Sequence, residues 1–332
     1  MNAPAPDRPG VAWWTHIATF VSHYGAFLIL LVMVLALSVI TPMVRGEQFF
    51  LTSRNLIQVL QQASINLIIA IGMTFVITSR GIDLSVGSIV ALSGVVAGIA
   101  MREGAGPYLG FATAVVTGAA CGAFNGLLIT RLKLPPFIVT LGTLGVFRGL
   151  ALVLTEGRPI YGFSREYLQI FAGRIGTVPV QVVVALVLAL VFWWVLTKTR
   201  FGKYTTAIGG NEETARLAGI PVDWMKLKIY TLTGLLTGIA GALLTARLSS
   251  ADPVAGQLFE LDAIAATIMG GTSLMGGEGT IGGTVVGTLI MSLVRNGMNL
   301  LNVPTFWQQL VLGSVIILAV VLDQFRRRGA SR

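Results

Sequence analysis

The sequence is poor in the side chains that build catalytic and metal sites. It has one cysteine, Cys121, and two histidines, His16 and His23, both ahead of the first long apolar run. A single cysteine excludes an intrachain disulfide, and too few cysteines and histidines are present for the usual metal-ligand clusters. The sequence also offers no nucleophile with a base beside it and no pair of buried acids. We therefore predict that the chain is not an enzyme and binds no metal or cofactor of its own.

Charge is also scarce. Charged residues make up 11% of the chain and hydrophobic residues 54%, with a mean hydropathy of +0.81, whereas soluble domains carry about 25% charged residues. The net charge of +9 is dispersed over loops rather than gathered on one face, which argues against nucleic-acid binding. The polar and apolar alternation of a membrane barrel is missing too. The composition predicts a protein embedded in membrane lipid.

Apolar runs near the length of one membrane-crossing helix recur along the chain. They predict an all-α integral membrane protein with about ten transmembrane helices. Seven glycines fall within 270–283, so we expect broken or re-entrant Gly-rich segments around the eighth and ninth spans. The predicted spans are 25–41, 56–78, 85–101, 108–130, 136–155, 179–196, 226–247, 261–275, 280–300 and 306–323.

The lysines predict the orientation in the membrane. Ten spans place both termini on one side, and all five lysines fall on that side. Because the cytoplasmic loops of membrane proteins are enriched in Lys and Arg, we predict that both termini are cytoplasmic. The expected parts are an uncleaved cytoplasmic tail over 1–24, a polytopic transmembrane domain over 25–325 and a basic cytoplasmic tail over 326–332. The external segment 156–178 mixes arginines with aromatic residues, which suits either a headgroup belt or a docking surface for a soluble partner.

The most polar stretch is the cytoplasmic loop 197–228. It predicts a helix of about two turns over 212–218. The signals are an N-cap, two acids in the first turn and a glycine stop: Asn211, Glu212, Glu213 and Gly219. So short a helix is unstable alone in water. We therefore expect lipid headgroups or a groove on another protein to cover its small and apolar side chains, which are Ala215, Leu217 and Ala218.

Polar side chains inside the predicted spans indicate a pathway. Gln58, Gln62 and Asn66 recur at i, i+4 and i+8 and form one stripe of a helix. Such residues tend to face a bundle interior or a wet cavity, and amides and hydroxyls without fixed charge suit a neutral polyol. The other candidates are Asn125, Thr140, Thr143, Asn296 and Asn299. The alternative is that all of these groups form hydrogen bonds between helices.

Glycines four residues apart recur in several predicted spans. This spacing lets helix backbones approach closely, so it predicts packing contacts rather than a site. The pairs are Gly94 with Gly98, Gly118 with Gly122, Gly234 with Gly238, and Gly283 with Gly287.

The segment "RGIDLSVGS" at 80–88 places two charges, Arg80 and Asp83, between apolar runs. We predict a structural role at the inner end of the second and third spans, with Asp83 or Ser85 capping the third helix, and keep a gating contact as the alternative. The spacing of Gly81 and Gly87 returns between Gly277 and Gly283. It suggests an internal repeat that the five-span offset would invert, although the span count puts both segments on the cytoplasmic side.

The chain has no phosphate-binding loop. The pattern G-x-x-x-x-G-K-[ST] does not occur. The segment "GEGTIG" at 277–282 fits G-x-G-x-x-G, but that fingerprint requires a soluble βαβ unit, and here the flanks are membrane spans. ATP hydrolysis, if it drives this protein, belongs to another chain.

Four ordered segments carry a family resemblance: "RGIDLSVGSIVALSG", "PPFIVTLGTLGVFRGLALVLTEGRPI", "GNEETARLAGI" and "MGGTSLMGGEGTIGGTVVGTLI". From about residue 50 to the C-terminus the chain resembles the permeases of bacterial ATP-binding-cassette importers for monosaccharides, of the ribose/xylose/galactose type. The resemblance implies import of a neutral monosaccharide across the inner membrane. It implies three partners: a cytoplasmic ATPase with two fused nucleotide-binding modules that holds the ATP and Mg²⁺, a periplasmic sugar-binding protein, and a second permease copy or paralogue.

The resemblance also assigns a coupling helix. It implies that 211–220 inserts into a groove on the ATPase, through residues that include Asn211, Glu212, Glu213, Ala215, Arg216, Ala218 and Gly219. Two alternatives stay open: a related importer permease for nucleosides or branched-chain amino acids, and an ion-coupled secondary transporter. Against the second, no acidic residue lies in the middle of a predicted span to take a proton.

Overall fold

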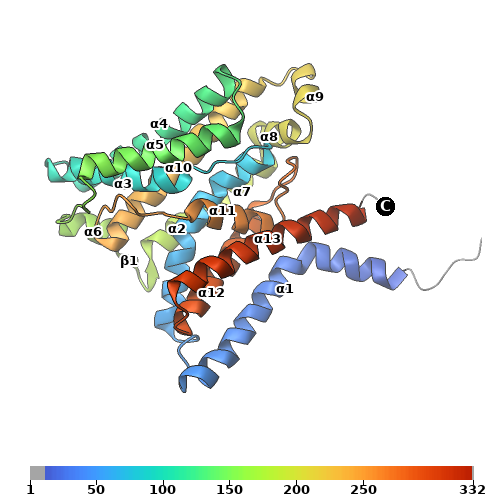
Figure 1. Ribbon diagram of the computed structural model, residues 1–332, viewed down its shortest axis with the longest axis horizontal. Coiled ribbons are helices and arrows are strands. Elements are labelled where there is room, and N and C mark those ends of the chain that lie inside the picture. Colours follow the sequence, from blue (N-terminus) through green and yellow to red (C-terminus); the bar gives the residue numbers. More distant parts are fainter. Residues whose placement is uncertain (1–11, 331–332) are drawn as a thin grey trace, which may run out of the picture.

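A computed structural model describes residues 12–330, with the side chains of residues 25–321 apart from 316 and 319. The described chain is helical except for short connections and one small hairpin, which confirms the predicted all-α class (Figure 1). The helices are α1 (Ala12–Arg45), α2 (Ser53–Thr78), α3 (Val86–Arg102), α4 (Pro107–Arg131), α5 (Pro136–Thr155), α6 (Arg165–Phe171), α7 (Val180–Lys198), α8 (Arg200–Gly210), α9 (Glu212–Leu217), α10 (Val222–Leu248), α11 (Phe259–Met269), α12 (Ile281–Leu300) and α13 (Thr305–Ala330); the strands β1 (Arg174–Ile175) and β2 (Val178–Pro179) pair antiparallel.

Six helices of the described chain are long and apolar enough to cross a membrane. They are the part of α1 over Gly25–Arg45 and the whole of α2, α4, α5, α7 and α10. The other four predicted spans correspond to α3, α11, α12 and α13. Helices α3 and α11 have 17 and 11 residues, α12 is not among the six, and the side chains of α13 are described only in part. The count of ten therefore stays a prediction. Helix α11 has 11 residues and is about 16 Å long at 1.5 Å per residue. The chain then leaves the helical path from 270 to 280, where Gly270 and Gly271 follow the helix.

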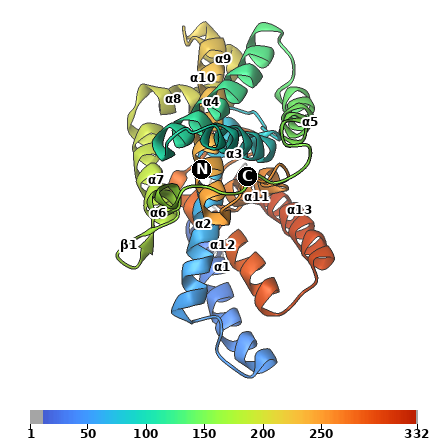
Figure 2. The ribbon, with the colours of Figure 1, turned by 90° about the vertical axis from the view of Figure 1, so that its left-hand side faces the viewer.

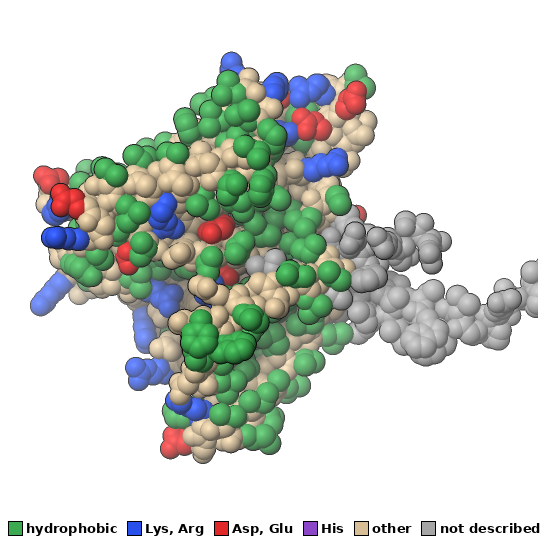
Figure 3. All heavy atoms as spheres, in the orientation of Figure 1, with side chains coloured by type: hydrophobic (Ala, Val, Ile, Leu, Met, Phe, Trp, Pro, Cys, Tyr) green, Lys and Arg blue, Asp and Glu red, His purple; other side chains and the backbone are tan. Residues whose placement is uncertain are grey.

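Helix α2 forms the core. Every side chain from Ala63 to Ser79 is buried, and α2 contacts α7, α10, α11 and α12. Helix α5 lies at the opposite side of the molecule from α7 (Figure 2), and its main packing partners among the described helices are α3 and α4. Hydrophobic side chains spread over much of the visible surface, while most charged ones lie near its edges: over α8 and α9, at the far ends of α3 and α6, and at the lower end (Figure 3). This distribution is typical of a protein whose middle faces lipid.

Helices α4 and α10 cross with their backbones in contact. The space that a Cβ would take at Gly118 is occupied by the carbonyl oxygen of Gly234, and the space at Gly234 by that of Gly118. Gly122 and Gly238 lie equally close to the opposite backbone. The glycine spacing in these two helices therefore serves packing, as the sequence predicts.

Candidate functional site

The predicted short helix is present as α9. Asn211 is its N-cap: the Asn211 side-chain oxygen accepts a hydrogen bond from the Thr214 backbone N–H at 2.9 Å. Gly219 follows the helix with φ +82°, in the left-handed region that favours glycine at helix ends. The local signals thus predicted the helix to within one residue.

The covered face of α9 differs from the expectation. Ala215 is buried by this chain itself, in a cluster with Ile208, Val222 and Met225. It is therefore not free to contact a partner, and its expected place on a docking face is wrong. Leu217 is 84% exposed, and Ala218 is exposed beside it. Leu217 is thus the large apolar side chain that α9 presents outward.

Ion pairs tie α9 to its neighbours. The Lys133 ammonium lies 2.6 Å from the Asp223 carboxylate, which also meets Arg216 at 3.1 Å. Glu212 pairs with Lys226 at 2.6 Å. The hydrogen bond to Asp223 raises the pKa of Arg216 further above its usual value, so this guanidinium stays charged. Such exposed pairs contribute little to stability, about 0–1 kcal/mol each, but they connect α9 to the start of α10 and to the loop between α4 and α5.

Two large apolar side chains lie next to these charges in the sequence. Leu217 follows Arg216, and Trp224, which is 55% exposed, follows Asp223. The Lys228 ammonium lies over the Trp224 ring at 5.1 Å from its centroid. These two exposed apolar side chains, set among charged residues, are the candidates for a contact with a partner.

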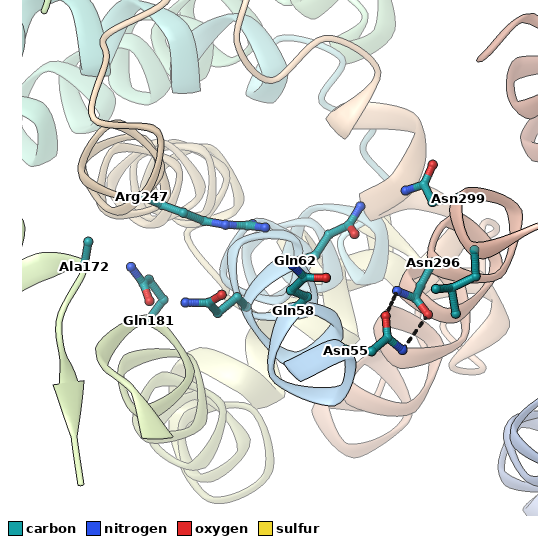
Figure 4. Close-up of a pocket in the computed structure, with 10 residues that line it drawn as sticks. Asn55, Gln58, Gln62, Ala172, Gln181, Arg247, Asn296 and Asn299 are labelled. Carbon is teal, nitrogen blue, oxygen red and sulfur yellow. Dashed lines mark hydrogen bonds between the residues drawn. The ribbon is translucent and has the colours of Figure 1, made fainter. Parts of the chain in front are cut away.

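A polar cavity of about 520 Å³ lies at the end of the molecule away from α9, between the start of α2 and the end of α10. It brings together Gln58, Gln62, Asn296 and Asn299, four of the predicted pathway residues (Figure 4). The sequence analysis did not select the remaining lining residues, which are Asn55, Gln61, Ala172, Gln181, Arg247 and Leu300. Helices α2, α10 and α12, the end of α6 and the start of α7 supply these residues, so their meeting depends on tertiary packing.

The amides at one wall of the cavity bind each other. Asn55 donates to the Asn296 side-chain oxygen at 3.1 Å, and Asn296 donates to that of Asn55 at 2.7 Å. Asn299 accepts a hydrogen bond from Gln308 at 3.0 Å. Asn55 and Asn296 therefore join α2 to α12, which is the structural alternative that the sequence left open.

The other four pathway candidates lie elsewhere. Asn66 is buried deeper in α2, and its side-chain oxygen has no hydrogen-bond partner among the described residues. Asn125 donates to the Ser85 hydroxyl at 2.8 Å, and Thr140 donates to the Ile82 carbonyl at 3.2 Å. Thr143 bonds to the Thr140 carbonyl within α5. Asn125 and Thr140 thus hold the segment 79–85 and do not line the cavity.

That segment is non-helical, connects α2 to α3 and is mostly buried. Asp83 has no exposed surface, and one of its carboxylate oxygens accepts from the Ser85 N–H at 2.9 Å and from the Ser85 hydroxyl at 2.6 Å. Neither side chain caps α3, because its N-cap residue, Ser85, makes no side-chain hydrogen bond to the helix. The capping prediction is therefore wrong, although the role of Asp83 here is structural: it folds the turn that leads into α3. Arg80 lies exposed at φ 65°.

The two glycine-rich segments pack against each other. The Gly277 N–H donates to the Thr78 carbonyl at 2.9 Å, and Gly276 lies close to Arg80. Gly209, at the end of α8, fits between Thr78 and Gly277 without room for a side chain. Because an inverted repeat would place the two copies at opposite ends, the glycine pairs at 81–87 and 277–283 are not its two copies. Gly283 instead packs on Gly270, where α12 crosses the end of α11.

Charged groups inside the helical domain form contacts that were not predicted from the sequence. Arg295 lies 2.7 Å from Asp262, which is 2% exposed. Arg148 donates to the backbone carbonyls of Pro253 at 2.7 Å and Ala255 at 2.8 Å. A charged residue within an apolar run indicates a partner inside the protein. Arg148 in the predicted span 136–155 and Arg295 in the predicted span 280–300 are such residues.

Residues 55–320 match the family described as "Branched-chain amino acid transport system / permease component". The chain belongs to this permease family. The permease is 46% identical to the ribose import permease protein of Bacillus subtilis over 93% of this chain and 95% of that protein. It is 41% identical to the D-allose transport system permease protein of Escherichia coli, over 93% and 94% of the two chains. With the L-arabinose ABC transporter permease protein of Azospirillum brasilense it shares 40% identity over 98% and 92%. No solved structure matches the permease.

Proposed function

We propose that this permease carries a neutral monosaccharide through the bacterial inner membrane as the transmembrane subunit of an ATP-driven, binding-protein-dependent importer. The observation that carries the proposal is the similarity along more than nine tenths of the chain to permeases named for ribose, allose and arabinose. The family description names branched-chain amino acids, but the cavity lining includes no carboxylate to receive an α-ammonium group. This composition favours a polyol over an amino acid.

Ten spans with both termini in the cytoplasm form part of the proposal. All five lysines then face the cytoplasm together with α9, and the polar cavity opens toward the outer side. Helices α2 and α10 have 26 and 27 residues, and each is followed by a non-helical segment and a shorter helix, α3 or α11. We infer an inverted repeat that relates α2–α5 to α10–α13, in place of the glycine pairs.

The proposed soluble partners bind at the two ends of the permease, one at the cytoplasmic end and one at the outer end. Helix α9 docks on a separate ATPase with two fused nucleotide-binding modules, which holds the ATP and Mg²⁺. A periplasmic sugar-binding protein docks at the outer end, near α6. A second permease copy or paralogue packs along α5, where Gly142, Gly145 and Gly149 have open space beside them and small residues allow close helix approach.

Sugar uptake by the complete assembly tests the proposed function. In proteoliposomes that hold the permease with its ATPase and binding protein, we expect uptake of one of D-ribose, D-allose or L-arabinose, only with ATP. Labelled leucine and adenosine serve as competing substrates. Preferential uptake of either competitor, or sugar uptake driven by an ion gradient without the ATPase, would overturn the proposal.

Replacing Leu217 by aspartate tests the docking surface. We expect at least about a tenfold loss of ATP-driven uptake, because a carboxylate would replace an apolar contact that the partner buries. The permease itself should purify and melt like the wild type, since Leu217 packs against nothing in this chain. The matched control is Leu51→Asp, an exposed leucine at the other end of the molecule. Wild-type uptake by Leu217→Asp would contradict a docking role for α9.

A further inference from the structure

The cavity at the outer end of α2 has an unusual lining. Seven of its ten lining side chains are carboxamides, one is a guanidinium, and carboxylates and aromatic rings are both missing from this set. Each carboxamide supplies N–H donors and a carbonyl acceptor. The cavity therefore offers both kinds of hydrogen-bonding group in one place.

Several of these groups point to a ligand rather than to each other. Gln181 is fully buried and donates to the Phe171 carbonyl at 2.9 Å, which leaves its side-chain oxygen buried without a donor among the described residues. Arg247 is half-buried and extends across the cavity toward Gln62 (Figure 4). The structure gives neither Arg247 nor Gln62 a side-chain hydrogen bond within the described chain. Arg247 and Gln62 therefore keep hydrogen-bonding groups free at the cavity surface, where a bound molecule can pair with them.

The mixture of donors and acceptors selects the class of ligand. A sugar hydroxyl donates one hydrogen bond and accepts others, so it matches carboxamides on both counts. An anion would bind the guanidinium but would also face the carbonyl oxygens of the amides, which repel it. An apolar molecule would leave most of the lining unpaired. A volume of about 520 Å³ lies within the range of small-molecule sites.

We propose that this cavity is a low-affinity subsite for a neutral monosaccharide within a single permease subunit. Arg247 and Gln62 bind adjacent hydroxyls. The Asn55 and Asn296 pair fixes the wall by joining α2 to α12. The subsite rests on the proposed function, which it deepens by naming where the sugar first meets the permease. Without an aromatic ring for stacking, the lining holds sugar only weakly, so a sugar handed over by a binding protein can leave inward.

Binding to the permease alone tests the subsite. In lipid nanodiscs with millimolar D-ribose, D-allose or L-arabinose, saturation-transfer NMR should detect at least one bound sugar. Gln62→Leu and Arg247→Met should each raise its Kd about tenfold, because each removes hydrogen bonds to the ligand. The matched control is Gln309→Leu, an exposed amide on α13 outside the lining. If Arg247→Met fails to fold, Gln62→Leu still provides the measurement.

Three outcomes would overturn the subsite. The first is no sugar signal from the wild type, and the second is the same Kd for Gln62→Leu as for Gln309→Leu. The third is stronger binding of inorganic phosphate or ribose 5-phosphate than of ribose, which would make the cavity an anion site. ATP-driven sugar uptake by the wild-type assembly is a separate measurement: if uptake succeeds and the binding test fails, the subsite alone is wrong. If the wild-type assembly takes up no sugar, the proposed function itself is wrong.

Discussion

Replacing Gly234 by leucine is expected to prevent the helical domain from folding. The first side-chain carbon would collide with the Gly118 carbonyl oxygen and with the Gly122 backbone on α4. Overpacking costs about 1–3 kcal/mol where side chains can shift. Here the obstacle is backbone, so α4 and α10 would have to separate along their whole crossing.

Yield and thermal melting of the purified permease measure this effect. We expect little or no monodisperse protein from Gly234→Leu. The matched control is Gly313→Leu on α13, where a new Cβ would meet nothing within 4 Å, and this variant should behave like the wild type. A normal yield and melting temperature for Gly234→Leu would show that the two helices do not touch through their glycines.

Replacing Arg295 by methionine is expected to lower the free energy of unfolding by about 3–5 kcal/mol. Asp262 is almost fully buried, and the substitution would leave its carboxylate without the opposite charge. Breaking one side of a buried ion pair costs more than replacing both partners by apolar residues. The double variant Asp262→Leu with Arg295→Met should therefore regain most of the lost stability.

Thermal unfolding of the single and double variants in nanodiscs provides the comparison. Equal destabilisation of the single and double variants would mean that the two side chains do not act as a pair. Sugar uptake by the double variant adds a second result. A stable double variant that no longer transports would assign the pair a part in the transport cycle.

Short-range signals predicted some elements well. The limits of α9 follow from Asn211, the acids of the first turn and Gly219, all within nine residues, and the structure has them. The burial of Ala215 could not be predicted, because it depends on α8 and α10 packing over it. Helical periodicity placed Gln58 and Gln62 on one stripe and both line the cavity, but it could not show that Asn66 lies too deep to reach it.

Contacts between distant residues escaped the sequence entirely. Asn55 and Asn296 are 241 positions apart, and only the fold of α2 against α12 joins them. The prediction of an inverted copy of "RGIDLSVGS" was wrong for the same reason. Glycine spacing in the sequence does not show where a segment lies in space, and the structure places both segments beside Gly209 at one end. Span length was informative for uniform helices and failed at α11, because a half-length helix has no clear hydropathy peak.

The shortness of α11 bears on how the protein enters the bilayer during synthesis. At about 16 Å it would span about half of the hydrocarbon layer, and it contains Asp262, so α11 alone should not leave the insertion channel for lipid. Helix α12 contains Arg295 in its C-terminal half, and a charged side chain inside a span opposes insertion of that span alone. As a hairpin, the two helices neutralise each other's charge through the contact at 2.7 Å. We therefore expect α11 to remain in the insertion channel until α12 has been synthesised, so that the two helices enter the lipid together.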